Sequence, residues 1–136
     1  MDNTEDRLQE VFFYGLYMDP EILEDKGVRP RNPRKASVKG YQLRVGNRAT
    51  LLREEDKVAH GILYSLTHAE IDKLYWGAGL DCYVSEAVAV DTEQAGNIVA
   101  LCCNLLIPPA DTETNPGYLN QLEACMHKLG LPAPTI

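Results

Sequence analysis

Apolar and polar residues alternate over short stretches of this chain, and turn-forming residues separate those stretches. Six stretches are rich in β-branched and aromatic residues, a composition that predicts six strands. They are residues 10–14 (EVFFY), 37–46 (SVKGYQLRVG), 49–53 (ATLLR), 58–66 (VAHGILYSL), 83–90 (YVSEAVAV) and 97–107 (NIVALCCNLLI). A turn at residues 46–48 is expected to join the second and third strands, and Gly61 is expected to form a bulge in the fourth.

Three short helices are predicted from the residues at their ends. Asp19-Pro20 supplies an N-cap and a first helical residue, which predicts a helix over about residues 20–25. Residues 67–70 (THAE) have the capping-box pattern and begin the second helix. Asn115-Pro116 begins the third, which ends near Gly130. The residues expected to face the core are Ile71, Leu74 and Tyr75 in the second helix and Leu119, Leu122, Met126 and Leu129 in the third.

Glycine and proline mark two segments as loops, residues 27–35 (GVRPRNPRK) and 76–81 (WGAGLD). The strands and helices do not alternate regularly, so the pattern predicts an α+β domain in which the helices flank a mixed, curved sheet. The length of 136 residues suits one domain over residues 1–136, with residues 1–9 expected to be flexible.

The charge of the chain limits its partners. A formal net charge of −7 disfavours nucleic acid, which is bound through clustered lysine and arginine. The basic cluster over residues 29–39 contains two prolines and is expected to be a solvated loop, with a small anionic ligand as the alternative. No apolar stretch approaches the roughly 18 residues of a membrane helix, and the polar start does not resemble a signal peptide. We therefore expect a cytoplasmic protein that binds neither nucleic acid nor membrane.

The cysteines do not suggest a metal site. Cys82, Cys102, Cys103 and Cys125 lack the spacing of zinc ligands, and adjacent strand residues point to opposite faces. Buried free thiols are the simpler interpretation. No motif implies a metal or an organic cofactor.

The stretch Tyr14-Gly15-Leu16-Tyr17-Met18, which joins an aromatic strand to a helix, resembles the start of the γ-glutamylcyclotransferase-like (AIG2-like) family. Three later stretches resemble motifs of that family in the same order, so the likeness extends from about residue 11 to residue 132. These are VAHGILYSLTHAEIDKLY, CYVSEAVAV and NPGYLNQLEACMHKLGLP.

The resemblance implies a small mixed β-barrel flanked by short helices, with a cavity at one end. It also implies a chemistry in which the α-amine of a γ-glutamyl amine or amino acid attacks its own γ-carbonyl. The products are 5-oxoproline and the released amine. Because the substrate supplies the nucleophile, an enzyme with this transferase or lyase activity must only hold the substrate curled and move protons.

The first part of the predicted site is the stretch of residues 14–18, called the glycine loop below. Inward-pointing amides in such a turn favour a carboxylate, and Gly15 permits close approach of the ligand. The alternative is an ordinary strand-to-helix turn, whose amides are satisfied by Asp19. The substrate-binding residues predicted here are Tyr14, Gly15, Leu16, Tyr17, Met18, Trp76 and Tyr83, of which Trp76 is a candidate cavity lid.

The family's catalytic glutamate is absent from this sequence. Its slot holds Ala78 or, with the register shifted by one, Gly77, and Leu16 replaces the hydroxyl residue of the first loop. Asp81 is the candidate substitute, because it shares strand parity with Tyr83. Its alternative role is that of a loop or turn former. Glu86 has the opposite parity and is expected to be solvated.

Histidine offers no better candidate. His68 and His127 lie on exposed helix faces, and His60 is more simply a structural residue than a cavity residue. Two hypotheses therefore remain open. The first is a divergent γ-glutamylcyclotransferase that uses another acid; the second is a catalytically inactive relative, a pseudoenzyme that binds a small carboxylate or a partner protein.

Overall fold

The computed structural model describes residues 4, 6–77, 79–80, 82–93 and 96–134. These residues form a closed five-stranded barrel with three α-helices and one short 3-10 helix. The strands are β1 (Leu8–Phe13), β2 (Arg31–Val45), β3 (Ala49–Thr67), β4 (Tyr83–Thr92) and β5 (Gly96–Leu105). The helices are η1 (Leu16–Met18), α1 (Pro20–Asp25), α2 (His68–Leu74) and α3 (Pro116–Lys128).

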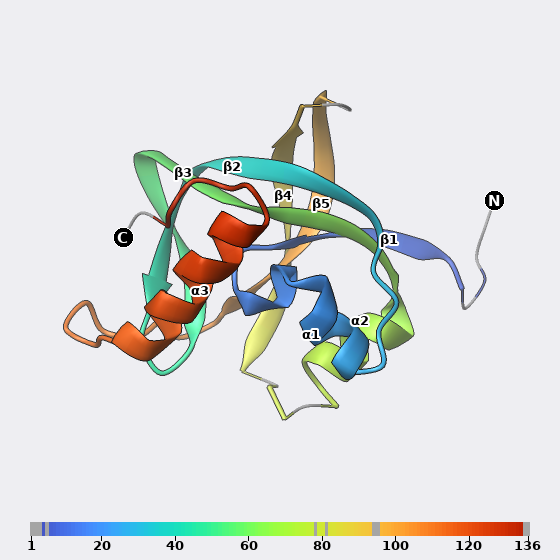
Figure 1. The fold of residues 1–136 in the computed structure, drawn as a ribbon, viewed down its shortest axis with the longest axis horizontal. Coiled ribbons are helices and arrows are strands. Elements are labelled where there is room, and N and C mark those ends of the chain that lie inside the picture. The colour runs from blue at the N-terminus through green and yellow to red at the C-terminus, as the bar shows by residue number, and fades with distance from the viewer. Residues whose placement is uncertain (1–3, 5, 78, 81, 94–95, 135–136) are drawn as a thin grey trace.

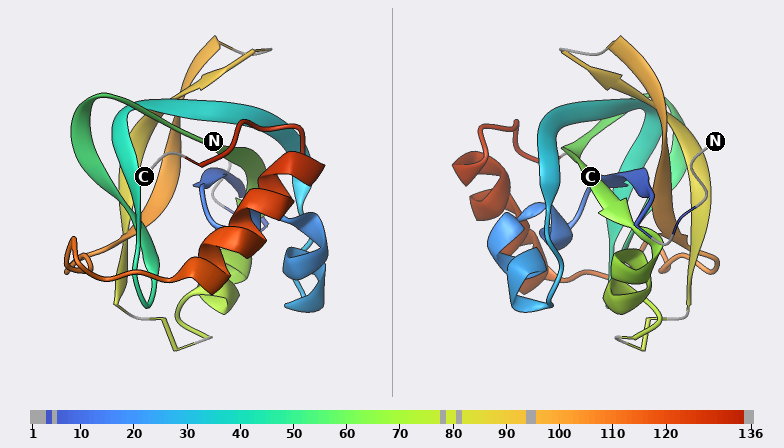
Figure 2. Two further views of the ribbon diagram at one scale, coloured as in Figure 1. Left: turned by 60° about the vertical axis from the view of Figure 1, so that its left-hand side comes forward. Right: turned by 90° about the vertical axis from the view of Figure 1, so that its right-hand side faces the viewer.

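The strands follow the order β1-β3-β2-β4-β5 around the barrel. All neighbouring pairs are antiparallel except β1 and β5, which close the barrel with a parallel contact between Val11 and Leu101. Helix α3 lies across the front of the barrel in Figure 1, with α1 and α2 beside it. The two views of Figure 2 show the β4–β5 hairpin projecting away from the helices. The predicted α+β class with a mixed curved sheet is confirmed.

The barrel has one strand fewer than predicted, because residues 49–53 and 58–66 belong to a single strand, β3. The charged residues between these two stretches suggested a connection. In the structure they form an irregularity in the β2–β3 ladder: Lys39 pairs with Val58 and Tyr41 with Arg53, so residues 54–57 lie opposite Gly40 alone. The strand thus crosses a polar, exposed stretch without ending.

Strand β2 begins at Arg31, so the predicted loop over residues 27–35 is too long. The ladder is irregular between Arg31 and Arg34, where Pro33 has no amide hydrogen and Asn32 has a positive φ of 54°. Arg31 forms an ion pair with Glu70, and Arg34 forms one with a carboxylate of β1. These two arginines of the basic cluster are thus neutralised within the chain.

Gly61 does not form the expected bulge, since it pairs in register with Ala36. Its role is to allow close approach of β1. A Cβ atom built on Gly61 would lie 2.1 Å from the carbonyl oxygen of Phe13 and 3.0 Å from the ring of Phe12. Glycine is therefore needed here for space.

The predicted helix boundaries are confirmed. The side chains of Asp19 and Asn115 accept hydrogen bonds from backbone amides at the starts of α1 and α3. In α2 both hydrogen bonds of the capping box are present between Thr67 and Glu70. Leu74 and Leu122 of the predicted apolar faces are completely buried.

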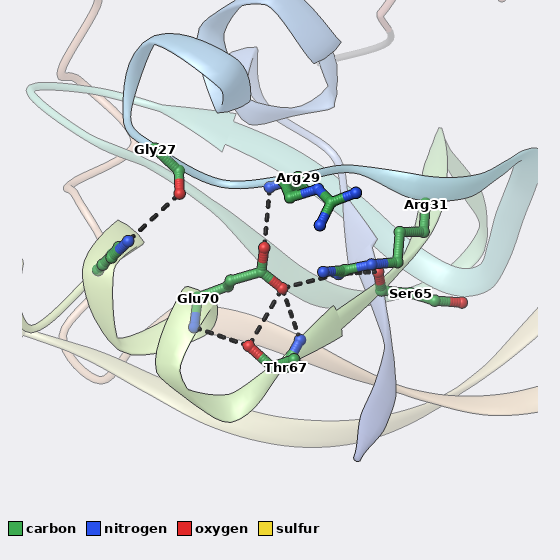
Figure 3. Close-up of polar contacts among 7 residues, drawn as sticks. Gly27, Arg29, Arg31, Ser65, Thr67 and Glu70 are labelled. Carbon is green, nitrogen blue, oxygen red and sulfur yellow. Dashed lines mark hydrogen bonds and ion pairs between the residues drawn. The ribbon is translucent and has the colours of Figure 1, made fainter. Parts of the chain in front are cut away.

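The carboxylate of Glu70 also anchors α2 to the segment before β2, as Figure 3 shows. One oxygen accepts hydrogen bonds from the Arg31 guanidinium at 2.8 Å and from the Thr67 amide at 2.9 Å, and the other accepts from the Arg29 amide at 2.8 Å. Partial burial disfavours the charge, but these hydrogen bonds outweigh that cost and lower the pKa of Glu70 to about 2.

Replacing Glu70 with glutamine is expected to lower the free energy of unfolding near neutral pH by about 2 kcal/mol, because charge-assisted hydrogen bonds are lost. An unfolded glutamate has a pKa of about 4.3. The stabilisation is therefore complete above that value and is lost as the pH falls toward the folded pKa. Urea unfolding should show a larger difference between wild type and Glu70→Gln near pH 7 than near pH 3.

The matched control is Glu24→Gln, because Glu24 is exposed on α1. It should unfold like the wild type at both pH values. A Glu70→Gln variant whose loss of stability is the same near pH 7 and near pH 3 would contradict the assigned role of the charge.

The cysteines are free thiols, as predicted, but they are not all buried. Cys102, Cys103 and Cys125 are buried, whereas Cys82 is exposed because it lies in the connection that precedes β4. Within the described ranges no group of three His, Cys, Asp or Glu side chains is arranged to hold a metal ion. Among the helices of the same residues, none is long and apolar enough to cross a membrane.

Candidate functional site

A cavity of about 450 Å³ opens at the end of the barrel where the helices gather. Its walls come from the end of β1 and the glycine loop, from α1, from the β2–β3 turn, from the ends of α2 and β4, and from α3. The described residues that line it are Phe13, Tyr14, Gly15, Leu16, Tyr17, Ile22, Lys26, Asn47, Arg48, Ala49, Tyr75, Leu80, Tyr83 and Tyr118. Segments from most of the sequence thus meet at this site.

Tyrosine is the commonest residue of the cavity wall, where five of the seven tyrosines in the chain lie. Three of them form a continuous row. The ring centroids of Tyr17 and Tyr75 are 5.6 Å apart, and those of Tyr75 and Tyr83 are 5.4 Å apart. The ring of Phe13 packs edge-on against Tyr17 at 6.1 Å. Such contacts between rings make a stiff, mainly apolar wall.

Three tyrosine hydroxyl groups are already committed as donors. The hydroxyls of Tyr14, Tyr17 and Tyr83 donate to backbone carbonyl oxygens at 2.6, 2.7 and 2.6 Å. The carbonyls belong to Cys103, Leu74 and Ala49 respectively. Because a hydroxyl has one proton, these three oxygens can only accept hydrogen bonds from a ligand.

The cavity tyrosines are neutral near physiological pH. Burial raises the pKa of all five, and it raises the pKa values of Tyr14 and Tyr75 well above the usual range. A phenolate base is therefore not available here. Among the described lining residues there is also no Asp, Glu, His or Cys.

The charged groups that line the described part of the cavity are both cations. The Lys26 ammonium lies 5.8 Å from the ring centroid of Tyr17, in a cation–π contact. The Nη1 atom of Arg48 is buried and has no hydrogen-bond partner within the described chain. A buried N–H donor without a partner raises the free energy of the folded protein. An anionic acceptor in the cavity would remove this cost by accepting a hydrogen bond from Nη1.

The glycine loop adds donors on the other side. The Leu16 amide donates to the Tyr118 hydroxyl at 3.2 Å, and the Met18 amide donates to the Gly15 carbonyl at 3.0 Å. Within the described residues the amides of Gly15 and Tyr17 form no hydrogen bond. Asp19 caps the following helix through the Glu21 amide and leaves these two loop amides free.

Five of the predicted substrate-binding residues line the cavity, namely Tyr14, Gly15, Leu16, Tyr17 and Tyr83. The other two do not. Met18 is fully buried in the core, where its carbonyl accepts from the Tyr64 hydroxyl at 2.7 Å. Trp76 is 63% exposed, so the tryptophan predicted as a lid does not cover the cavity in this conformation.

Ala78, the predicted slot of the family's glutamate, and Asp81, its candidate substitute, lie outside the described residues. Gly77, the alternative slot for the glutamate, is exposed and donates its amide to the Asp72 carbonyl. Glu86 is exposed as predicted, although it accepts a hydrogen bond from the buried Asn104. The histidine weighed as a cavity residue, His60, lines smaller hollows elsewhere.

Sequence reasoning missed Lys26, Asn47, Arg48, Tyr75 and Tyr118 as cavity residues. The turn at residues 46–48 was predicted. An arginine in a hairpin turn is ordinarily exposed, so the sequence near Arg48 did not indicate a position in the cavity. The tyrosine content was a usable signal. Both missed tyrosines lie at helix ends that were themselves predicted correctly, Tyr75 at the end of α2 and Tyr118 in the first turn of α3.

The chain matches no protein-family model and no curated protein sequence. Solved structures do resemble it. One described as a gamma-glutamyl cyclotransferase has a TM-score of 0.76 and 18% identity, over 93% of this chain and 82% of that one. A yeast gamma-glutamyl cyclotransferase specific to glutathione has a TM-score of 0.64 and 11% identity, over 93% and 90% of the two chains. An AIG2-like protein from Mus musculus has a TM-score of 0.58 and 14% identity, over 96% and 97%.

At these identities the likeness shows the fold. The closed mixed barrel with three short α-helices is the fold of γ-glutamylcyclotransferase and AIG2-like proteins. The fold implied by the sequence motifs is therefore confirmed.

Proposed function

We propose that the cavity binds a small ligand that carries a carboxylate, of the γ-glutamyl class. The observation that carries this proposal is the buried Nη1 atom of Arg48, which has no partner among the described residues at the cavity wall. A carboxylate would supply the missing acceptor through a charge-assisted hydrogen bond. Lys26 and the unpaired amides of Gly15 and Tyr17 favour the same sign of charge.

The ligand's other polar group is also constrained. The hydroxyl oxygens of Tyr14, Tyr17 and Tyr83 can only accept, so they favour a ligand with N–H donors. An amine and a carboxylate on one small molecule are features of γ-glutamyl compounds. Two of the structural neighbours are described as gamma-glutamyl cyclotransferases, which supports this choice of class.

Cyclisation of the ligand to 5-oxoproline is the second candidate function. It requires a group that removes a proton from the α-ammonium and returns one to the departing amine. The observation that favours it is the cavity position of Leu80 and Tyr83, which flank the connection that contains Asp81. The neutral tyrosines cannot do this work, so Asp81 remains the candidate acid and base.

We expect at least one member of a panel of γ-glutamyl amino acids, γ-glutamyl amines and glutathione to bind. Isothermal titration calorimetry measures the binding, and chromatography of the same mixtures measures 5-oxoproline. If the chain is catalytic, Asp81→Asn should bind the ligand but release no 5-oxoproline. The matched control is Asp72→Asn, because Asp72 is exposed on α2 and does not line the cavity.

The outcomes separate the two functions. Binding without release supports the binding role, and Ala78→Glu then tests whether only the carboxylate is missing. Release that survives in Asp81→Asn would clear that residue of the acid and base role. A folded protein that binds no member of the panel would contradict the proposed ligand class.

A further inference from the structure

The chain that leads from β5 into the first turn of α3 contacts two loops of the cavity, the turn at residues 46–48 and the glycine loop, and each loop has a glycine at a point of close approach. A Cβ atom on Gly46 would lie 2.1 Å from the Glu113 carboxylate and 2.6 Å from the side chain of Pro109. A Cβ atom on Gly15 would lie 2.6 Å from the Tyr118 hydroxyl. A larger residue at either glycine would therefore force a neighbouring side chain of residues 109–118 to shift.

The side chain of Asn115 uses its two polar atoms for different loops. Its Nδ2 atom donates to the Gly46 carbonyl oxygen at 3.0 Å, at the start of the turn that carries Arg48. Its Oδ1 atom accepts from the Tyr118 amide at 3.2 Å and so caps α3. One half-buried amide thus joins the arginine turn to the first turn of the helix.

Further hydrogen bonds extend each connection to the cavity wall. On one side the Glu113 carboxylate accepts from the Asn47 amide at 3.0 Å, which holds the residue next to Arg48. On the other side the Tyr118 hydroxyl accepts from the Leu16 amide at 3.2 Å. Asn115 stands between these two contacts.

We propose that Asn115 is a positioning residue, which fixes the arginine turn through Nδ2 and the glycine loop through Oδ1. The inference rests on the proposed function, since Arg48 matters only if it binds the ligand. Asn115 does not line the cavity, so its effect on a ligand must pass through the two loops. Substitutions of Asn115 can separate the role of Nδ2 from the role of Oδ1.

Asn115→Asp keeps an oxygen that can cap α3 but removes the donor to Gly46. The Asn47 amide should then exchange with solvent about tenfold faster, as expected for the loss of one hydrogen bond from a small turn. The Leu16 amide should exchange at the wild-type rate. Asn115→Ala removes both functions, so both amides should exchange faster. Hydrogen exchange of single amides, followed by nuclear magnetic resonance, measures these rates without any ligand.

The matched control is Asn120→Asp, an exposed position on the same helix, which should leave both amides unchanged. Amides in the β1–β3 ladder report global stability, and a merely structural effect would accelerate them as well. Wild-type rates at Asn47 in Asn115→Asp and in Asn115→Ala would overturn the proposal. If Asn115→Ala does not fold, Asn115→Asp alone tests the proposal, because this variant keeps the N-cap of α3.

Titration with γ-glutamylalanine and glutathione adds a functional readout. Asn115→Asp should weaken their binding about fivefold relative to Asn120→Asp, because the arginine turn is less ordered. If neither compound binds the wild type, the proposed function fails, while the exchange rates still test the role of Asn115. Affinity that is unchanged in Asn115→Asp despite faster exchange at Asn47 would overturn the link to the ligand.

Discussion

Replacing Gly61 with alanine should lower the free energy of unfolding by at least about 3 kcal/mol, at the upper end of overpacking effects in protein cores. The new Cβ atom would lie 2.1 Å from the backbone carbonyl oxygen of Phe13, and a backbone atom in a paired strand cannot move aside cheaply. Urea unfolding measured by circular dichroism tests this expectation. The same shift would displace Tyr14 and the glycine loop, since both follow directly after β1.

Gly117→Ala is the control for this prediction. Gly117 lies in the first turn of α3, and the nearest atom to a Cβ built there is 3.8 Å away. Alanine favours a helix more than glycine does, so this variant should be as stable as the wild type or slightly more stable. A Gly61→Ala protein with an unchanged unfolding midpoint would show that β1 and β3 are not in the close contact described here.

The second large effect is expected at Arg48. Arg48→Gln should weaken binding of the ligand found in the γ-glutamyl panel by about 30-fold to 100-fold, because a charge-assisted hydrogen bond to a carboxylate is lost. Arg48→Lys should recover only part of the affinity, since an ammonium cannot bind a carboxylate through two parallel hydrogen bonds. Calorimetric titration gives both values.

Stability distinguishes this binding role from a structural one. The Nη1 atom of Arg48 has no partner in the described chain, so Arg48→Gln should keep the wild-type unfolding midpoint or raise it slightly. Arg53→Gln is the control, because Arg53 is exposed on β3 and lies outside this cavity. Equal ligand affinity in Arg48→Gln and Arg53→Gln would rule out Arg48 as the carboxylate contact.

The helix ends show what local patterns can predict. The capping box of Thr67 and Glu70 and the caps at Asp19 and Asn115 involve residues two or three apart, so their hydrogen bonds are decided within one turn. Strand β3 shows the limit of such patterns. Its charged stretch separates two predicted strands, and only the irregular pairing with β2 shows that they form one strand.

The candidate site was predicted in part for the same reason. The glycine loop carries a short motif, and the resemblance of that motif to a known family was enough to assign the loop to the cavity. Arg48 and Tyr118 reach the same cavity only because the barrel closes and the chain returns along α3. Their positions depend on contacts between residues distant in sequence, such as the bond between Tyr118 and Leu16. No short motif encodes those contacts.

The parallel contact between Val11 and Leu101 joins the first strand of the barrel to its last. During synthesis β1 can pair with β3 early, but it must wait for β5 before the barrel is complete. Closing so long a chain segment costs entropy and slows folding. The glycine loop follows β1, and Tyr118, which holds that loop, is made later still. Completion of the cavity is therefore expected to be the last event in folding, and a nascent chain that stops before α3 would lack the Tyr118 part of the cavity wall and the hydroxyl that holds the glycine loop.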